Sequence, residues 1–181
     1  MEETNIAGLV HCPESNLKLG SGICPVSSLG KVNVCVGTDG ASSNDDLDMI
    51  GELRTASLVD NYRSVTVLGH LNRSLSMVDW LRAGTINGAK ALKIDHLVGS
   101  LEKGKEADFI SIKINALPVY SVRNTVLMSG NNEVTNVWVA GKPLLREGVI
   151  TVLDEDRVNQ TAIQWGENIK AALHELHPTK E

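Results

Sequence analysis

The turn at residues 37–40, Gly-Thr-Asp-Gly, carries the strongest chemical signal in the sequence. It directly follows residues 32–36, where alternating valines predict a strand. Ligands of parallel α/β folds bind at the carboxyl ends of the strands. The carboxylate of Asp39, between two glycines, is therefore able to approach a metal ion or a substrate closely. The alternative is that Asp39 caps the turn after the strand, and on these residues alone both interpretations stay open.

A second signal is His11, which ends an apolar segment at residues 6–11 that predicts a short buried strand. The polar loop after it contains Ser15 and Asn16. If the two strands are neighbours, His11 and Asp39 share one face of the sheet. On its own, a histidine at the end of a strand is more often a structural hydrogen-bonding group than a catalyst.

The other acidic and histidine clusters point to structure rather than to chemistry. Asp45, Asp46 and Asp48 suit the positively polarised start of a helix. His174 and His177 lie about one helical turn apart in a polar tail, where we expect a solvated face. The candidate functional residues, His11 and Asp39, therefore lie at the ends of the two predicted strands.

These two strands need further elements to position them. A short helix from Pro25 to Gly30 between them predicts a βαβ unit with parallel strands. Helices are also expected after a cap at Ser43 or Asn44, from a capping box at Ser76, and over residues 85–92. Beyond residue 99 the pattern predicts a strand at 110–114, a hairpin at 137–145 and a terminal helix at 155–176, with Ile163, Ile169 and Leu173 as its apolar anchors.

Composition bounds the class of protein. The 181 residues are 42% hydrophobic and 22% charged, which is ordinary for a globular protein of one domain or slightly more. A net charge of -5 argues against a nucleic-acid partner, and the absence of an apolar run of about 20 residues argues against a membrane partner. The acidic start, Met-Glu-Glu, and three cysteines without a Cys-x-x-Cys pair predict a cytoplasmic protein with reduced thiols.

Several segments together resemble one known family. Residues 11–22, 37–44, 52–56, 83–92, 99–108 and 137–148 are similar, in the same order, to the metal-dependent amidohydrolase superfamily. The similar branch is that of the aminohydrolases and chlorohydrolases, which includes deaminases of 5-methylthioadenosine and S-adenosylhomocysteine. Each segment alone is suggestive, whereas the ordered set is highly specific and covers nearly the whole chain.

The resemblance implies an α/β fold that is part of a larger one. Residues 1–97 are expected to form the C-terminal portion of a (β/α)₈ barrel, namely its last two strands and their helices. Residues 98–153 are expected to form part of a small β-sandwich, and residues 154–181 a C-terminal helix and tail. A complete barrel typically needs about 250 residues, which is more than this chain contains.

The resemblance also assigns roles to the residues singled out above. Asp39 aligns with the aspartate that ends the eighth barrel strand, which is a metal ligand and a catalytic group that helps to deprotonate the attacking water. His11 aligns with the histidine after the seventh strand, on the substrate side of the barrel mouth. Ser15 and Asn16 belong to the same loop and are expected to contact the substrate. The implied cofactor is zinc, with iron as the alternative.

The family's chemistry requires more groups than this chain supplies. Zinc in a catalytic site usually takes three protein ligands, and the family provides most of them in a His-x-His pair and a further histidine on earlier strands. The sequence contains no His-x-His. We therefore expect a truncated chain that is inactive alone. Its expected partner is a second copy or a chain that supplies the missing half of the barrel.

The implied reaction is hydrolytic deamination of an adenosine-type nucleoside, a small heteroaromatic amine, with release of ammonia. Two alternatives remain open. One is a triazine-type chlorohydrolase, because it shares most of these motifs. The other is a non-catalytic protein, either truncated or completing a barrel with another chain.

Overall fold

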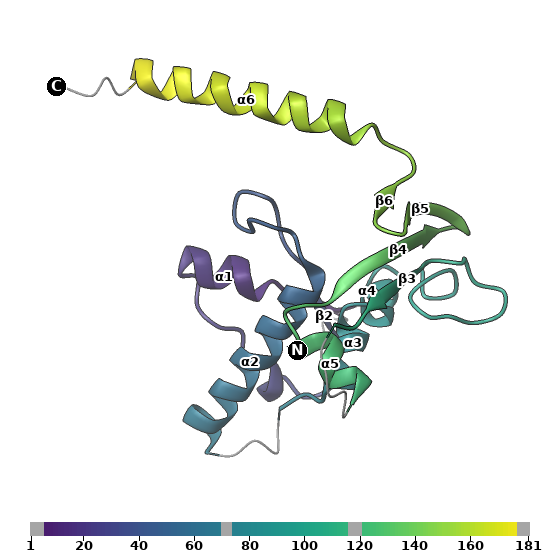
Figure 1. Ribbon diagram of the computed structural model, residues 1–181. Helices are drawn as coiled ribbons and strands as arrows, with labels where there is room; N and C mark the ends of the chain where they lie inside the picture. Colours follow the sequence, from purple (N-terminus) through teal and green to yellow (C-terminus); the bar gives the residue numbers. More distant parts are fainter. Residues whose placement is uncertain (1–5, 70–73, 116–120, 177–181) are drawn as a thin grey trace.

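The computed structural model describes residues 6–69, 74–115 and 121–176, and the chain forms a mixed α/β structure (Figure 1). The elements follow one another in this order: β1 (Leu9–His11), α1 (Pro13–Leu19), the 3₁₀ helix η1 (Val26–Ser28), β2 (Val34–Val36), α2 (Met49–Leu68), α3 (Met77–Ala83), α4 (Ile86–Ala91), β3 (Phe109–Lys113), α5 (Val122–Met128), β4 (Glu133–Val139), β5 (Lys142–Arg146), β6 (Val149–Ile150) and α6 (Glu155–Leu176). None of the described helices is long and apolar enough to span a membrane.

The predicted βαβ unit is confirmed, but its helix is different. Strands β1 and β2 pair in parallel, with His11 opposite Val36. The seven-residue helix α1 forms where a polar loop was expected. The helix predicted from Pro25 to Gly30 is reduced to the three residues of η1. Helix α1 begins at Pro13, a residue suited to a first turn, and ends at Gly20, whose φ of 67° is left-handed. Its short polar sequence has no apolar period, so the pattern did not reveal it.

Helix α2 begins later than the sequence predicted. Asp48 is its N-cap and accepts a hydrogen bond from the amide of Ile50, so neither Ser43 nor Asn44 holds that position. Asn44 instead accepts a hydrogen bond from the amide of Leu47 at 2.7 Å and thereby fixes the loop before the helix. The capping box at the start of α3 is present as predicted.

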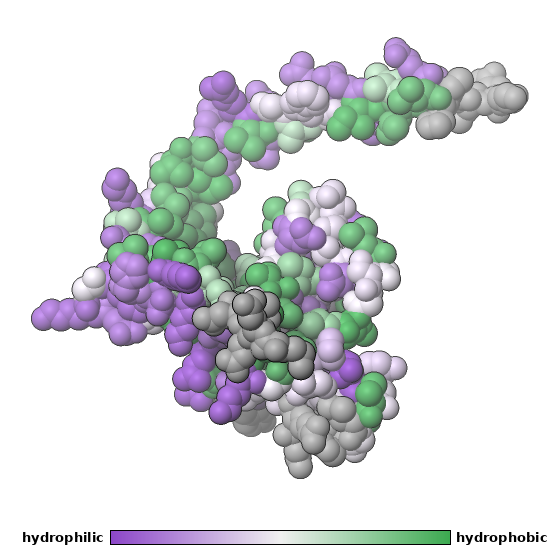
Figure 2. All heavy atoms as spheres, turned by 180° about the vertical axis from the view of Figure 1, so that it is seen from behind, coloured by the Kyte–Doolittle hydropathy of each residue, from purple (hydrophilic) through white to green (hydrophobic). Residues whose placement is uncertain are grey.

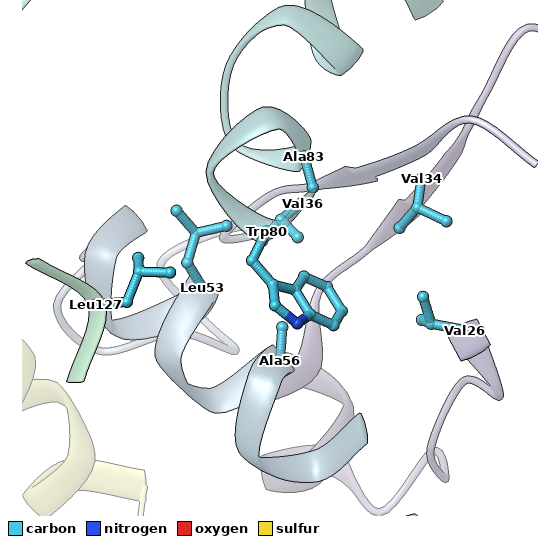
Figure 3. Packing of buried hydrophobic residues seen from close by; sticks show 8 residues of the cluster. All are labelled: Val26, Val34, Val36, Leu53, Ala56, Trp80, Ala83 and Leu127. Carbon is cyan, nitrogen blue, oxygen red and sulfur yellow. The ribbon is translucent and has the colours of Figure 1, made fainter. Parts of the chain in front are cut away.

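The core lies between β2 and the helices α2, α3 and α5. Trp80 of α3 is fully buried there, and the apolar side chains around it come from these four elements and from η1 (Figure 3). The other buried members of this cluster are Val26, Val34, Val36, Leu53, Ala56, Ala83 and Leu127. This cluster sets the position of β2 relative to α2, and therefore the position of the segment that follows β2.

The second half of the chain forms an antiparallel sheet in the order β3-β4-β5-β6, and the predicted hairpin is its β4–β5 pair. Helix α6 extends away from the sheet, and every described residue in it is exposed (Figure 1). The predicted anchors Ile163, Ile169 and Leu173 are 65%, 54% and 53% exposed, so the described chain does not bury them. Hydrophobic side chains are visible along this helix in Figure 2.

The two tryptophans on α3 and α6 provide a matched test of this core. Trp80 is 0% exposed and Trp165 is 63% exposed. Trp80→Ala should lower the free energy of unfolding by about 3–5 kcal/mol, because it removes a buried ring and leaves a cavity. Trp165→Ala should change it by less than about 0.5 kcal/mol. Chemical denaturation of both variants measures the difference, and equal losses would contradict the assignment of the core.

Candidate functional site

The parallel pairing of β1 and β2 brings two distant chain segments to one end of the sheet. The amide of Gly37, which follows β2, donates to the carbonyl of His11 at 3.1 Å, so the two strands end together. Gly37 is closely packed there, since a Cβ on it would lie 3.3 Å from the side chain of Val10. The segments after the two strands, α1 and the loop at 37–47, therefore lie side by side at this end.

Asp39 and Ser15 meet at this end, a contact that the sequence did not predict. The Ser15 hydroxyl donates to Oδ2 of Asp39 at 2.8 Å, and the Ser43 hydroxyl donates to the same oxygen at 3.3 Å. Ser15 is buried, whereas Asp39 is exposed. The backbone of Asp39 has a φ of 62°, in the left-handed region that few residues other than glycine adopt. The strained backbone and the two hydroxyl groups together fix the carboxylate at the surface.

The hydrogen bonds to Asp39 favour the ionised form of its carboxylate. The bond from Ser15, followed by those from the Gly40 amide and from Ser43, holds the pKa of Asp39 below its ordinary value. At neutral pH the side chain is therefore a fixed, exposed anion. Such a group can bind a cation or accept a proton from a polarised water molecule.

His11 lies inside the structure rather than at its surface. It is 2% exposed, and its Nδ1 has no hydrogen-bond partner among the described residues. Burial lowers the pKa of His11, and the charge of Asp60 opposes that shift only in part. No hydrogen bond joins His11 to Asp39 in the described part of the chain. The two residues share an end of the sheet, but they do not form a pair.

Asn16 is half-buried on α1, next to Ser15. Its amide donates to the carbonyl of Cys12 and its carbonyl accepts from the amide of Ser21, both within the local turn. Nothing within residues 6–69 joins its side chain to Asp39, so its expected contact with a substrate stays a prediction.

The structure also reveals a buried polar cluster that the sequence did not predict. The carboxylate of Glu52, on α2, accepts from the amide of Glu14 at 3.1 Å and from Nδ2 of Asn44 at 3.3 Å. The Glu14 carboxylate in turn accepts from the Thr55 hydroxyl at 2.7 Å. Burial raises the pKa of Glu52 above its ordinary value, and the charge of Glu14 adds to the rise. This fully buried carboxylate is invisible to local sequence patterns, because its partner Glu14 is 38 positions away in the chain.

The described residues do not form a complete metal site. Within residues 6–69, 74–115 and 121–176, no group of three or more His, Cys, Asp or Glu side chains is arranged to hold a metal ion. The candidate ligand Asp39 would supply one donor, whereas catalytic zinc usually takes three protein ligands. A cavity of about 830 Å³ lies beside the start of β2, lined among others by Val34, Arg82 and Lys90, and does not include Asp39.

Comparison with known proteins gives a consistent result. The sequence profile of the amidohydrolase family matches residues 1–144. The chain is 42% identical over 174 residues to a 5-methylthioadenosine/S-adenosylhomocysteine deaminase of Saccharophagus degradans, which covers 93% of this chain and 38% of that protein. It is 38% identical over 175 residues to a 5'-deoxyadenosine deaminase of Methanobrevibacter smithii, covering 93% and 39% of the two chains.

Solved structures agree with these relatives. A crystal structure of an adenosine deaminase from Xanthomonas campestris with bound zinc matches with a TM-score of 0.82 at 39% identity, covering 91% of this chain and 38% of that one. An atrazine chlorohydrolase from Arthrobacter aurescens complexed with zinc matches with a TM-score of 0.74 at 25% identity, covering 86% and 35%. The chain thus spans less than two fifths of the length of the proteins it matches.

The buried position of His11 predicts a pH dependence of stability. Its pKa in the folded chain lies below the ordinary value of 6.5 that it regains on unfolding, so the unfolded chain binds more protons. The contribution of His11 to stability is therefore complete above that pH and is lost as the pH falls through it. Between about pH 7.5 and about pH 5.5, this contribution should fall by up to about 1.4 kcal/mol.

Urea denaturation at the two pH values measures the loss. His11→Asn should show a smaller pH-dependent loss than the wild type, because asparagine does not titrate. His96→Asn, at an exposed position, is the control and should keep the full difference. An equal loss in the wild type and in His11→Asn would show that His11 does not cause it.

Proposed function

The chain belongs to the amidohydrolase family, and we propose that it forms the Asp39-bearing part of a hydrolytic deaminase of adenosine-type nucleosides. The substrates would be compounds such as 5-methylthioadenosine and S-adenosylhomocysteine. Water replaces the ring amino group by a hydroxyl group, and the amino group leaves as ammonia. The relatives named above, at 42% and 38% identity, support this substrate class.

The observation that carries the proposal is the fixed, ionised carboxylate of Asp39 at the carboxyl end of parallel strands. Hydrolytic deamination needs a group that removes a proton from the attacking water. Asp39 is exposed and held in place through Oδ2 by the Ser15 and Ser43 hydroxyls. In our proposal Asp39 accepts that proton, and Ser15 keeps its carboxylate oriented.

The proposed cofactor is zinc, with iron as the alternative. Both solved structures named above contain zinc. The described residues fit such an ion only in part, because Asp39 provides one ligand and the remaining ligands would come from outside the described chain. His11, Ser15 and Asn16 stay candidate substrate contacts. The three free cysteines, Cys12, Cys24 and Cys35, suit a reducing compartment, so the proposed location is the cytoplasm.

A triazine-type chlorohydrolase is the second candidate. The match to the atrazine chlorohydrolase covers 86% of this chain, but at 25% identity, against 39% for the adenosine deaminase. The lower identity favours the deaminase. A non-catalytic role is the third candidate, and the incomplete metal site of the described residues supports it for the 181-residue chain taken alone.

We further propose that the reaction requires a partner that supplies the rest of the fold. The boundaries at residues 97 and 153 belong to this proposal, with a barrel portion before and a sandwich portion between them. Such a partner would cover the apolar stripe of α6, which includes Trp165, Ile169 and Leu173. It would also cover Val10 of β1, which is 63% exposed. Either a covalently linked segment or a separate chain could supply the rest of the fold. A second copy of this chain is the alternative partner.

Activity distinguishes these functions. The protein purified from its source cells, with whatever chain accompanies it, should release ammonia from 5-methylthioadenosine or S-adenosylhomocysteine and no chloride from atrazine. Asp39→Asn should lower kcat at least about 100-fold, because it removes the proton acceptor. Glu133→Gln, an exposed residue of β4, should leave the rate unchanged.

The same assays on the 181-residue chain alone should give neither ammonia nor bound zinc. Chloride release without ammonia release would favour the chlorohydrolase. Failure of the native preparation with every substrate would favour the non-catalytic role. Stoichiometric zinc with full turnover in the isolated chain would show that no partner is required.

A further inference from the structure

Helix α1, which carries Ser15, lacks a capping side chain of its own. Its N-cap is Cys12, which makes no side-chain capping hydrogen bond within residues 6–69. Pro13 at the first position has no amide hydrogen, so Glu14 carries the first free N–H of the helix. Seven residues form only two turns, and helices of that length are unstable without outside contacts.

Glu52 provides the missing cap from another helix. Its Oε2 accepts from the Glu14 amide at 3.1 Å, although the two residues are 38 positions apart. A carboxylate at the start of a helix also stabilises it through the helix dipole. Glu52 is 0% exposed, so this contact is shielded from water.

The second carboxylate oxygen of Glu52 binds the loop that follows β2. Its Oε1 accepts from Nδ2 of Asn44 at 3.3 Å, and Oδ1 of Asn44 accepts from the Leu47 amide at 2.7 Å. Asn44 is therefore bonded at both ends of its side chain. The loop that follows β2 is fixed at this point.

The partners of Glu52 are the direct neighbours of the two hydroxyl donors to Asp39. Glu14 precedes Ser15, which donates to Oδ2 of Asp39 at 2.8 Å. Asn44 follows Ser43, which donates to the same oxygen at 3.3 Å. One buried carboxylate thus fixes both segments whose side chains orient Asp39.

We propose that Glu52 is a positioning residue for Asp39, and that it acts by capping α1 at Glu14 and bracing Asn44. The value of that position to catalysis rests on the proposed function. The positioning itself is a property of the chain and needs no activity to be measured. Burying a carboxylate costs stability unless hydrogen bonds compensate. The compensating bonds of Glu52 come from Glu14 on α1 and from Asn44 in the loop after β2.

Hydrogen exchange of the wild-type chain gives a first test without any substitution. Glu14 and Val78 hold the same position, the second of the helix, in α1 and α3, and both are half-buried. The Val78 amide has no hydrogen-bond acceptor in the described ranges. The Glu14 amide should exchange slower than that of Val78 by on the order of 100-fold. Equal exchange rates would overturn the cap.

The carboxyl ¹³C chemical shift of Asp39 at neutral pH gives the second test, because it senses the hydrogen bond from Ser15. Ser15→Ala should move this resonance. Glu52→Gln, which loses the charge, and Glu52→Asp, which keeps the charge but shortens the reach, should both move it in the same direction. The double variant Ser15→Ala/Glu52→Gln should move it by less than the sum of the two single changes, because part of the effect of Glu52 passes through Ser15. Glu133→Gln, an exposed residue of β4, is the control and should leave the resonance in place.

The outcomes separate positioning from other roles. A shift in Glu52→Gln but not in Glu52→Asp would mean that the charge acts through space, and it would overturn the proposal. Fully additive changes in the double variant would mean that Glu52 and Ser15 act independently, which also overturns it. If the Glu52 variants do not fold, the exchange of the wild-type Glu14 amide decides. A native preparation that fails to deaminate leaves both measurements intact, so the proposed function and this inference can fail separately.

Discussion

The site depends on a short parallel pairing of β1 with β2, three residues in each strand. Because parallel strands end at the same edge, α1 and the loop that carries Asp39 emerge next to each other. Helix α2 then returns beneath both, and its Glu52 contacts each of them. The core around Trp80 holds β2 against α2 and so keeps this arrangement in register. Without the pairing, Ser15 and Asp39 would be 24 residues apart in the chain with nothing to bring them together.

Apolar side chains are distributed unevenly between the core and the surface of the chain. The core occupies one side of β2, while Val10 of the neighbouring strand and the stripe along α6 remain open to solvent. Large exposed apolar patches are unusual on monomeric proteins, whereas singly exposed apolar residues are common. The exposed stripe along α6 agrees with a chain that spans 38% of the adenosine deaminase it superimposes on.

Local patterns predicted the features that depend on neighbouring residues. The strand at Val34–Val36, the capping box at Ser76 and the β4–β5 hairpin each have a signature within a few positions, and all three are present. Helix α1 has no apolar period and was missed. The placement of His11 and Asp39 at one end of the sheet followed from the predicted parallel strands. The contact of Ser15 with Asp39 was not predicted, and the burial of His11 depends on packing by elements far along the chain. The sequence did not predict the role of Glu52, because one of its contacts is to Glu14, 38 positions away. Its other contact is to Asn44, which was predicted to be a helix cap.

The isolation of α6 has a consequence for how the chain melts. Its 22 residues are all exposed, so its helical structure draws on its own hydrogen bonds and not on tertiary packing. Helices of this length are only marginally stable in water by themselves. The terminal helix should therefore unwind gradually while the domain around Trp80 unfolds cooperatively, and a single midpoint temperature would describe only the second process. Far-ultraviolet circular dichroism and core fluorescence would then report different transitions from one and the same polypeptide.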